Sequence, residues 1–175
     1  SKPDTAFLNG NKPFYIPEFS NDVQYETELV IKIAKNGKHI QEEFAHSYYK
    51  EVALGVDFTA RDLQNQFKNE GKPWELCKGF DNSAPVSNFI PISSLKNPQN
   101  ICFKGLINNK IVQEGSSADM IFHFDKLICF ISKYITLKMG DIIFTGTPSG
   151  VGTVKIGDVF TGYIEDNLLL NFKIK

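Results

Sequence analysis

The chain has few cysteines and histidines and no long apolar segment, and these absences exclude several classes of protein. Its three cysteines, Cys77, Cys102 and Cys129, lie far apart and form no Cys-x-x-Cys pair, which is typical of reduced thiols in a cytoplasmic protein. The three histidines lack the spacing of a zinc site. The longest apolar run, residues 127–131, is far too short to cross a membrane, and no secretory signal is present. We therefore expect a cytoplasmic protein without disulfides.

The chain also lacks an excess of charge of either sign. Lysine and arginine total 19 and aspartate and glutamate total 20, for a net charge of -1, which gives no reason to expect nucleic acid or a membrane as a partner. The 175 residues are 42% hydrophobic and 22% charged, a composition typical of one globular domain with a substantial core. Because no repeat, low-complexity segment or linker is present, we expect residues 1–175 to form a single domain.

Hydrophobic periodicity predicts a mainly β fold of the mixed α+β class with about two helices. We expect strands at residues 24–34, 52–56, 101–107, 111–113, 141–144, 159–164 and 168–174. Helices are expected at residues 59–70 and 122–134. Residues 77–100, which contain three prolines, are predicted to form a long loop.

Turn and cap residues refine these elements. Asn36-Gly37 is a hairpin signal after the first strand, and Asn108-Asn109 separates the two strands of a second expected hairpin. Thr59 and Asp62 have the spacing of a capping box at the start of the first helix, and Gly71 is placed to end that helix.

Three carboxylates carry the clearest chemical signal. Glu26 and Glu28 are one residue apart on an expected strand, so their side chains share a face, and Asp57 ends the next strand. Two like charges this close repel unless a cation or solvent separates them. Three oxygen donors without histidine or cysteine suit Mg²⁺ or Mn²⁺ better than Zn²⁺. The alternative for an isolated Glu-x-Glu is a solvated strand face.

Basic groups follow the third carboxylate. Arg61 and Gln64 are three residues apart and share a face of the first turns of the expected helix. A guanidinium beside helix N–H groups binds a carboxylate well; the alternative is a surface Arg61 that pairs with Asp62 or Asp57. Lys78 lies among apolar residues and is either a desolvated catalytic cation or a surface lysine with a buried stem.

A glycine-rich segment, residues 140–152, has the sequence Gly-Asp-Ile-Ile-Phe-Thr-Gly-Thr-Pro-Ser-Gly-Val-Gly. It is neither a Walker A loop nor a Gly-x-Gly-x-x-Gly motif. A strand that runs into such a turn can bring backbone N–H groups close to a small anion. The alternative is a tight β-turn without a ligand.

Taken together, these segments resemble the fumarylacetoacetate hydrolase family. The matching segments occur in family order and are Glu26-x-Glu28, residues 55–62 (Gly-Val-Asp-Phe-Thr-Ala-Arg-Asp), residues 78–81 (Lys-Gly-Phe-Asp), Gln113-Glu114-Gly115 and residues 140–152. Within the family, the sequence is most similar to the short single-domain members that act as acylpyruvases and oxaloacetate decarboxylases. The resemblance implies a β-roll of mixed sheets that close on one another, usually in a homodimer.

Carried over to this sequence, the resemblance also implies the roles of individual residues. Three residues would be ligands of Mg²⁺ or Mn²⁺: Glu26, Glu28 and Asp57. Four would face the substrate: Arg61, Gln64, Gly146 and Thr147. Lys78 would be the catalytic cation that stabilises negative charge beside the metal.

The implied substrate is a small 2-oxo acid or diketo acid. Cleavage of a C–C bond leaves a pyruvate enolate, whose charge the metal and Lys78 can accept. Hydrolysis of an acylpyruvate and decarboxylation of oxaloacetate both fit this scheme. One alternative is an isomerase or hydratase of the 2-hydroxyhepta-2,4-diene-1,7-dioate type, and another is a catalytically silent protein that binds metal or carboxylate.

Hydrolases of the family usually carry a water-activating His-x-x-Glu pair on a mobile lid, upstream of the region matched by Ser1. We expect this lid segment to be absent from residues 1–175: either it lies outside the sequence or the protein lacks it. His39 and Glu42 have the same spacing, but they follow the metal-ligand strand and do not correspond to the lid. A missing lid would affect hydrolysis more than decarboxylation, which needs no nucleophile.

Overall fold

Strands dominate the structure, a computed structural model that describes residues 1–175. The strands are β1 (Phe7–Asn9), β2 (Val23–Tyr25), β3 (Thr27–Ile33), β4 (Tyr49–Val56), β5 (Thr59–Ala60), β6 (Ala84–Val86), β7 (Ile90–Pro91), β8 (Cys102–Ile107), β9 (Lys110–Ser116), β10 (Ile142–Phe144), β11 (Gly152–Thr153), β12 (Val159–Ile164) and β13 (Asn167–Lys173). The α-helices are α1 (Glu42–Ala45), α2 (Arg61–Glu70), α3 (Glu75–Lys78) and α4 (Phe124–Tyr134). No helix is long and apolar enough to span a membrane.

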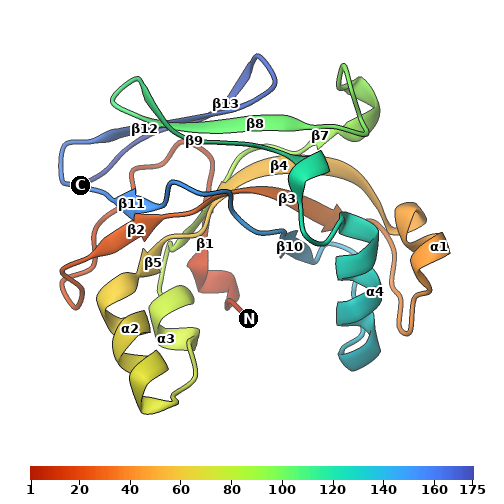
Figure 1. Cartoon of the computed structure of the whole chain (residues 1–175), viewed down its shortest axis with the longest axis horizontal. Helices are drawn as coiled ribbons and strands as arrows, with labels where there is room; N and C mark the ends of the chain where they lie inside the picture. Colours follow the sequence, from red (N-terminus) through yellow and green to blue (C-terminus); the bar gives the residue numbers. More distant parts are fainter.

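The strands form three sheets, of which the largest is mixed and the other two are antiparallel. The largest has the order β1-β6-β4-β3-β10, with β7 paired to β4, and its β1–β6 pair is parallel. A three-stranded sheet has the order β11-β2-β5, and a four-stranded sheet has the order β13-β12-β8-β9. The four-stranded sheet lies over β3 and β4, while α2 with α3 and α1 with α4 lie at the two ends of the molecule (Figure 1). This arrangement confirms the predicted mixed α+β fold with curled sheets and few helices.

Glycines allow the four-stranded sheet to approach the central strands closely. A Cβ atom at Gly162 of β12 would lie 2.4 Å from the side chain of Leu54 on β4. A Cβ atom at Gly105 of β8 would lie 2.4 Å from Oγ1 of Thr27 on β3. The contact surface is completed by fully buried apolar side chains from both layers, among them Leu29, Leu54, Phe160 and Ile164. Thr27, which separates Glu26 from Glu28, is therefore packed beneath the sheet.

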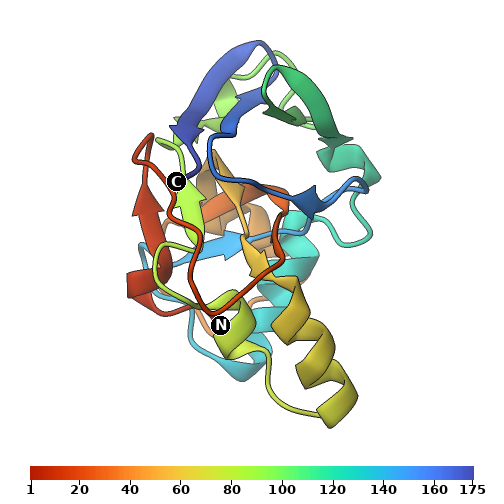
Figure 2. The same cartoon turned by 90° about the vertical axis from the view of Figure 1, so that its left-hand side faces the viewer.

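The expected strand at residues 24–34 changes sheets at Glu26. Its first part, β2, pairs with β5 and β11, and its second part, β3, pairs with β4 and β10. Both parts are extended, as predicted, but the prediction of one continuous strand over residues 24–34 was wrong. Glu26 therefore lies between a strand of one sheet and a strand of another. Figure 2 shows the layered sheets in side view.

Two turn predictions have different outcomes. The Asn108-Asn109 hairpin is confirmed, since both residues adopt positive φ angles of 51° and 66° and join β8 to β9. The Asn36-Gly37 hairpin is wrong: Gly37 bridges to Leu137, and α1 with a 3-10 turn intervenes before β4. The backbone groups of Gly37 are satisfied by the distant residue Leu137, so no local strand pairing is needed.

The expected helix at residues 59–70 begins two residues later than predicted. Thr59 belongs to β5 and pairs with Gln24, and Ala60 is the N-cap without a side-chain cap. Asp62 accepts hydrogen bonds from Ser20 and Asn21 instead of closing a capping box. Gly71 ends the helix with a φ of 63°, as expected. The expected loop at residues 77–100 contains the end of α3 and the strands β6 and β7. Pairing with β4 and β1 orders these short strands, which have no periodicity of their own.

Candidate metal centre

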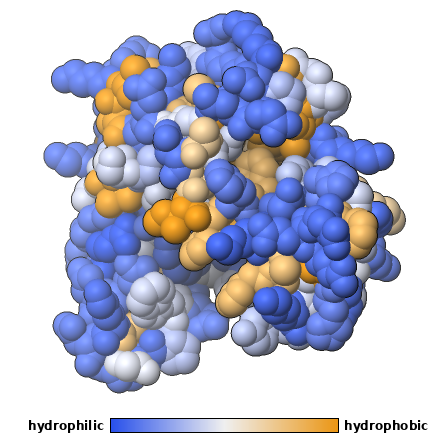
Figure 3. Space-filling view, turned by 45° about the vertical axis from the view of Figure 1, so that its right-hand side comes forward, coloured by the Kyte–Doolittle hydropathy of each residue, from blue (hydrophilic) through white to orange (hydrophobic).

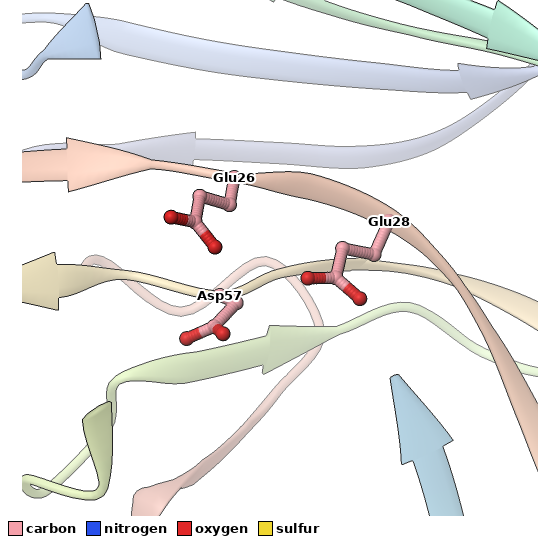
Figure 4. A group of neighbouring side chains, drawn as sticks. All are labelled: Glu26, Glu28 and Asp57. Atoms are coloured by element: carbon pink, nitrogen blue, oxygen red, sulfur yellow. The ribbon is translucent and has the colours of Figure 1, made fainter. Parts of the chain in front are cut away.

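The three predicted metal ligands come together where β3 begins and the antiparallel β4 ends. The backbone N–H of Asp57, just beyond β4, donates to the carbonyl of Glu26 at 2.8 Å, which joins the two segments. Ligand oxygens of Glu26, Glu28 and Asp57 lie within 4.8 Å of one another, and all three carboxylates point into the same space (Figure 4). Glu28 and Asp57 are 4% and 9% exposed, and the Glu26 side chain is 12% exposed. The solvated strand face is therefore not what the structure shows.

The two cations predicted from the sequence, Lys78 and Arg61, contact these carboxylates. Lys78 Nζ lies 2.6 Å from Glu26 Oε2 and 2.8 Å from Asp57 Oδ2. Arg61 Nη2 lies 2.5 Å from Glu26 Oε1, so Arg61 pairs with Glu26 rather than with Asp62 or Asp57. The side chains of Lys78 and Arg61 are only 19% and 18% exposed. The structure thus places both cations inside the carboxylate cluster.

The ion pairs shift the pKa values of both partners. Burial raises the pKa of Glu26, but hydrogen bonds and charge interactions with Lys78 and Arg61 outweigh it and lower the pKa below the usual range. Burial lowers the pKa of Lys78, but Asp57 and Glu26 outweigh it and raise the pKa. At neutral pH, Glu26 is therefore a carboxylate and Lys78 an ammonium group.

Glu28 differs from Glu26 because no cation contacts it. Burial, followed by repulsion from Asp57, raises its pKa to about 8, although the backbone N–H of Gly146 donates to Oε2 at 2.6 Å and favours the charged form. Without a divalent ion, Glu28 is consequently protonated at neutral pH. A bound cation would supply the positive charge that this carboxylate lacks.

We expect the thermal stabilisation by Mg²⁺ to increase with pH. In the metal-free protein the folded-state pKa of Glu28 is raised to about 8, so its contribution to stability is present below its unfolded pKa and is lost as pH rises through about 8. Bound Mg²⁺ favours the ionised form, so the rise in Tm on adding Mg²⁺ should be small at pH 6 and larger at pH 8.5. Thermal scans with and without Mg²⁺ at each pH measure the two changes in Tm.

Two variants test whether Glu28 makes the Mg²⁺ response depend on pH. Glu28→Gln should remove the pH-dependent loss of stability and the response to Mg²⁺, while Glu43→Gln, at an exposed position on α1, should change neither. A Mg²⁺ response in Glu28→Gln equal to that of the unmodified protein would exclude Glu28 from the ligand set.

Hydrogen bonds orient Arg61 from both sides. Its Nε donates to Gln24 Oε1 at 2.9 Å, and its Nη1 donates to Gln64 Oε1. The amide of Gln24 in turn donates to Asp22 at 3.0 Å. The predicted pairing of Arg61 and Gln64 on one helix face is therefore present, and Gln24 and Asp22 complete the support.

The turn that follows β10 lies against Glu28. Gly146 has a φ of 105°, a conformation that side chains disfavour, and it directs its N–H to Glu28. The hydroxyl of Thr147 donates to the carbonyl of Thr27 at 2.8 Å, so it is already engaged within the chain. The backbone N–H of Thr147 makes no hydrogen bond to protein. Like the N–H groups of Ser149 and Gly150 in the same turn, it is open to a ligand.

Sequence reasoning missed Lys2. Its Nζ lies 2.9 Å from Asp57 Oδ1, donates to Ser83 Oγ at 3.0 Å and contacts the carbonyl of Lys78. Burial lowers the pKa of Lys2, partly offset by Asp57. No local pattern distinguishes this lysine, because it reaches the site only through the packing of the N-terminal segment.

The donor set fits a hard divalent cation. All three ligands offer oxygen, which suits Mg²⁺ or Mn²⁺ better than Zn²⁺. Asp57 Oδ1 is buried without a hydrogen-bond partner, and the ammonium of Lys2 lies 2.9 Å from it. A cavity of about 980 Å³ is lined in part by Asp57 and Lys78. A second cavity, of about 560 Å³, is lined by Gly146 and Thr147 but by none of the three carboxylates. A ligand of small-molecule size therefore has access to the cluster from the side of Asp57 and Lys78.

Comparison with known proteins identifies the family. The profile of the fumarylacetoacetate (FAA) hydrolase C-terminal domain matches residues 1–171. The chain belongs to the fumarylacetoacetate hydrolase family. A relative in this family, the mitochondrial oxaloacetate tautomerase FAHD1 of Bos taurus, is 38% identical over 174 residues, which cover 99% of this chain and 79% of the relative.

Two further members of the family represent other reactions. The mitochondrial oxaloacetate decarboxylase of Dictyostelium discoideum is 41% identical over 159 residues, or 90% of this chain and 73% of the relative. The crystal structure of fumarylpyruvate hydrolase from Pseudomonas aeruginosa, in complex with Mn²⁺ and pyruvate, has a TM-score of 0.93 and 31% identity over 99% of this chain and 76% of that chain. The predicted resemblance to the family is thus confirmed.

Proposed function

We propose that the protein is a divalent-metal-dependent enzyme that acts on small, enolisable 2-oxo acids such as oxaloacetate. The observation that carries this proposal is the buried carboxylate cluster of Glu26, Glu28 and Asp57 with the ammonium of Lys78 between two of its members. The relatives named as oxaloacetate tautomerase and oxaloacetate decarboxylase support this substrate class. A bound Mg²⁺ or Mn²⁺ supplies a Lewis acid that makes a 2-oxo acid easier to deprotonate or to cleave.

The residues around the cluster have distinct roles in this proposal. Lys78, held as an ammonium group by Glu26 and Asp57, stabilises the negative charge that develops on the 2-oxo oxygen. Arg61, fixed by hydrogen bonds to Gln24 and Gln64, attracts the distal carboxylate of a diacid. The free N–H of Thr147, beside Gly146, binds the carboxylate next to the 2-oxo group.

Decarboxylation and keto–enol interconversion of oxaloacetate share a step that this site would favour. Loss of CO₂ from C3 and movement of a proton at C3 both place negative charge on the 2-oxo oxygen, next to Lys78. Decarboxylation and keto–enol interconversion therefore require the same stabilising group, and neither needs a nucleophile. Hydrolysis of an acylpyruvate is the second candidate, which the hydrolase complex with Mn²⁺ and pyruvate favours; it additionally requires an activated water.

Pyruvate release and enol conversion by metal-stripped protein test this proposal. Oxaloacetate and acetylpyruvate are supplied with and without Mg²⁺, pyruvate is measured by a coupled assay, and the enol of oxaloacetate is followed by its ultraviolet absorbance. We expect Mg²⁺-dependent conversion well above the rate with Mg²⁺ alone. The ratio between the three signals separates tautomerase, decarboxylase and hydrolase.

Other outcomes would support the alternatives. Isomerisation of a dienoic diacid without pyruvate release would favour the isomerase or hydratase. A Mg²⁺-induced rise in Tm with no conversion of any substrate would favour the silent metal-binding protein and contradict the proposed enzyme.

The homodimer and the cytoplasmic location also remain proposals that rest on the resemblance and on composition. Apolar patches lie among hydrophilic side chains on the face shown in Figure 3. Large exposed side chains include Ile121, Phe130, Tyr134 and Ile135 on and beside α4. Exposed apolar side chains of this kind are typical of surfaces that a partner covers.

A further inference from the structure

Gln113, on β9 of the four-stranded sheet, lies directly behind the metal-ligand strand. It belongs to the Gln113-Glu114-Gly115 motif of the sequence, to which the proposed reaction assigns no role. Its side chain is 2% exposed, and the residue pairs with Gly105 across the sheet. Burial of a primary amide costs free energy unless its polar atoms are paired, so its partners indicate why the residue is there.

Three hydrogen bonds form a closed ring through this amide. The backbone N–H of Thr27 donates to Gln113 Oε1 at 2.7 Å. Gln113 Nε2 donates to Thr147 Oγ1 at 2.8 Å, and the Thr147 hydroxyl donates to the carbonyl of Thr27 at 2.8 Å. The second N–H of Gln113 Nε2 donates to the carbonyl of Pro148 at 2.9 Å. Every hydrogen of the amide group is therefore used.

The ring joins the two halves of the candidate site. Thr27 separates Glu26 from Glu28, so hydrogen bonds to both of its backbone polar groups fix the backbone from which both carboxylate side chains extend. Thr147 and Gly146 form the turn that orients Glu28 and offers an N–H to a carboxylate. Neither β3 nor the turn makes this closed arrangement alone.

Steric contacts hold β9 and the turn in one register. A Cβ atom at Gly150 would lie 2.3 Å from the carbonyl oxygen of Val112, and one at Gly115 would lie 3.2 Å from Pro148. The turn therefore contacts β9 on both sides of Gln113. The amide can bridge to Thr27 and Thr147 only because this packing sets its distance to both.

We propose that Gln113 is a positioning residue that sets the geometry of the metal ligands Glu26 and Glu28 relative to the carboxylate-binding turn. This inference rests on the proposed function, because it assigns Gln113 a role in metal and 2-oxo acid binding at that same site. Gln113 contacts neither the metal nor the reacting atoms; it acts through Thr27 and Thr147.

Three sets of variants test the ring. Gln113→Leu removes the amide at similar volume, and Gln113→Glu keeps an acceptor for Thr27 but removes both donors. Thr147→Val removes the hydroxyl at similar shape, whereas Thr147→Ser retains it. Ser132→Ala is the matched control, since Ser132 is fully buried and its hydroxyl accepts from Ile40 N–H and donates to the carbonyl of Cys129 on α4.

Binding of Mn²⁺, followed by electron paramagnetic resonance, and binding of pyruvate to the Mn²⁺-loaded protein are the main readouts. We expect Gln113→Leu to weaken both by about 10- to 100-fold, the range for groups that support metal ligands. Ser132→Ala should lower Tm but leave both affinities unchanged. Thr147→Ser should retain the affinities that Thr147→Val loses.

A double variant tests whether the residues act as one unit. If the hydrogen-bonded ring sets the Mn²⁺ affinity, the double variant Gln113→Leu with Thr147→Val should bind Mn²⁺ as tightly as whichever single variant has the lower affinity. Fully additive losses, or affinities in Gln113→Leu equal to those of Ser132→Ala, would overturn the proposal.

The readouts separate this inference from the proposed reaction. A protein that binds Mn²⁺ but converts no 2-oxo acid contradicts the enzyme, while the comparison of Mn²⁺ affinities still decides the role of Gln113. A protein that binds no Mn²⁺ contradicts both.

Discussion

Asp57→Ala is expected to abolish Mg²⁺-dependent turnover while the chain still folds. Asp57 supplies one of three ligand oxygens, and its Oδ1 is buried without a hydrogen bond. Loss of a group that supports a ligand costs about 10- to 100-fold in metal affinity, so loss of a ligand should cost at least about 100-fold. Titration of metal-free protein with Mn²⁺ and assay of oxaloacetate conversion over a range of Mg²⁺ measure the two effects.

The fold should survive because two consequences of the substitution oppose each other. Asp57→Ala removes the ion pairs to Lys78 and Lys2, but it also removes repulsion of Glu28. We therefore expect the Tm of the metal-free protein to change by about 4 °C or less, equivalent to roughly 1 kcal/mol.

Two further variants complete this test. Asp57→Asn, which keeps the volume, should lose metal binding as fully as Asp57→Ala. Asp166→Ala is the control, because Asp166 forms an ion pair with Lys96 in which the side chains are 75% and 83% exposed. It should change neither turnover nor metal affinity. Unchanged turnover in Asp57→Ala would remove Asp57 from the ligand set.

Lys78→Ala is expected to lower kcat far more than it weakens metal binding. The Lys78 ammonium lies between Glu26 and Asp57, and its charge matters most when negative charge develops on the substrate. Removal of one such stabilising group typically lowers kcat by about 10²- to 10³-fold. Metal affinity should not fall in parallel, since the ammonium also competes with the metal for the two carboxylates.

The kcat values of Lys78→Ala and of the unmodified protein are compared at saturating Mg²⁺. Without metal, the variant leaves the charges of Glu26 and Asp57 less neutralised and should be less stable. Lys78→Met keeps most of the apolar stem and should behave as Lys78→Ala. Lys96→Met, which removes an exposed lysine, is the control and should retain full kcat. Equal losses of kcat and Mn²⁺ affinity would instead indicate that Lys78 only organises the carboxylates.

Local sequence was sufficient where neighbours along the chain decide the conformation. The α4 helix follows from apolar residues at helical spacing, and the β8–β9 hairpin follows from Asn108-Asn109, which tolerates positive φ. The strand face shared by Glu26 and Glu28, ending near Asp57, likewise needs only the twofold period of an extended chain. These signals predicted both the mixed α+β class and the three carboxylates of the candidate metal site.

Local sequence failed where distant residues satisfy the backbone. Asn36-Gly37 is a strong hairpin signal, but Gly37 pairs with Leu137. Thr59 has the spacing of a capping box with Asp62, but Asp62 is bound by Ser20 and Asn21. In both cases the local preference is worth about 1 kcal/mol, which long-range pairing and burial readily exceed.

The sequence by itself determined which ligand chemistry is available: oxygen donors from three carboxylates, with Arg61 and Lys78 to balance them. Only the tertiary structure decided how these groups meet. The chain changes sheets at Glu26, Lys2 reaches Asp57 from the N-terminal segment, and Gln113 ties Thr27 to Thr147 across separations of 86 and 34 residues. Such contacts depend on how the sheets close over one another, and no periodicity along the chain records that closure.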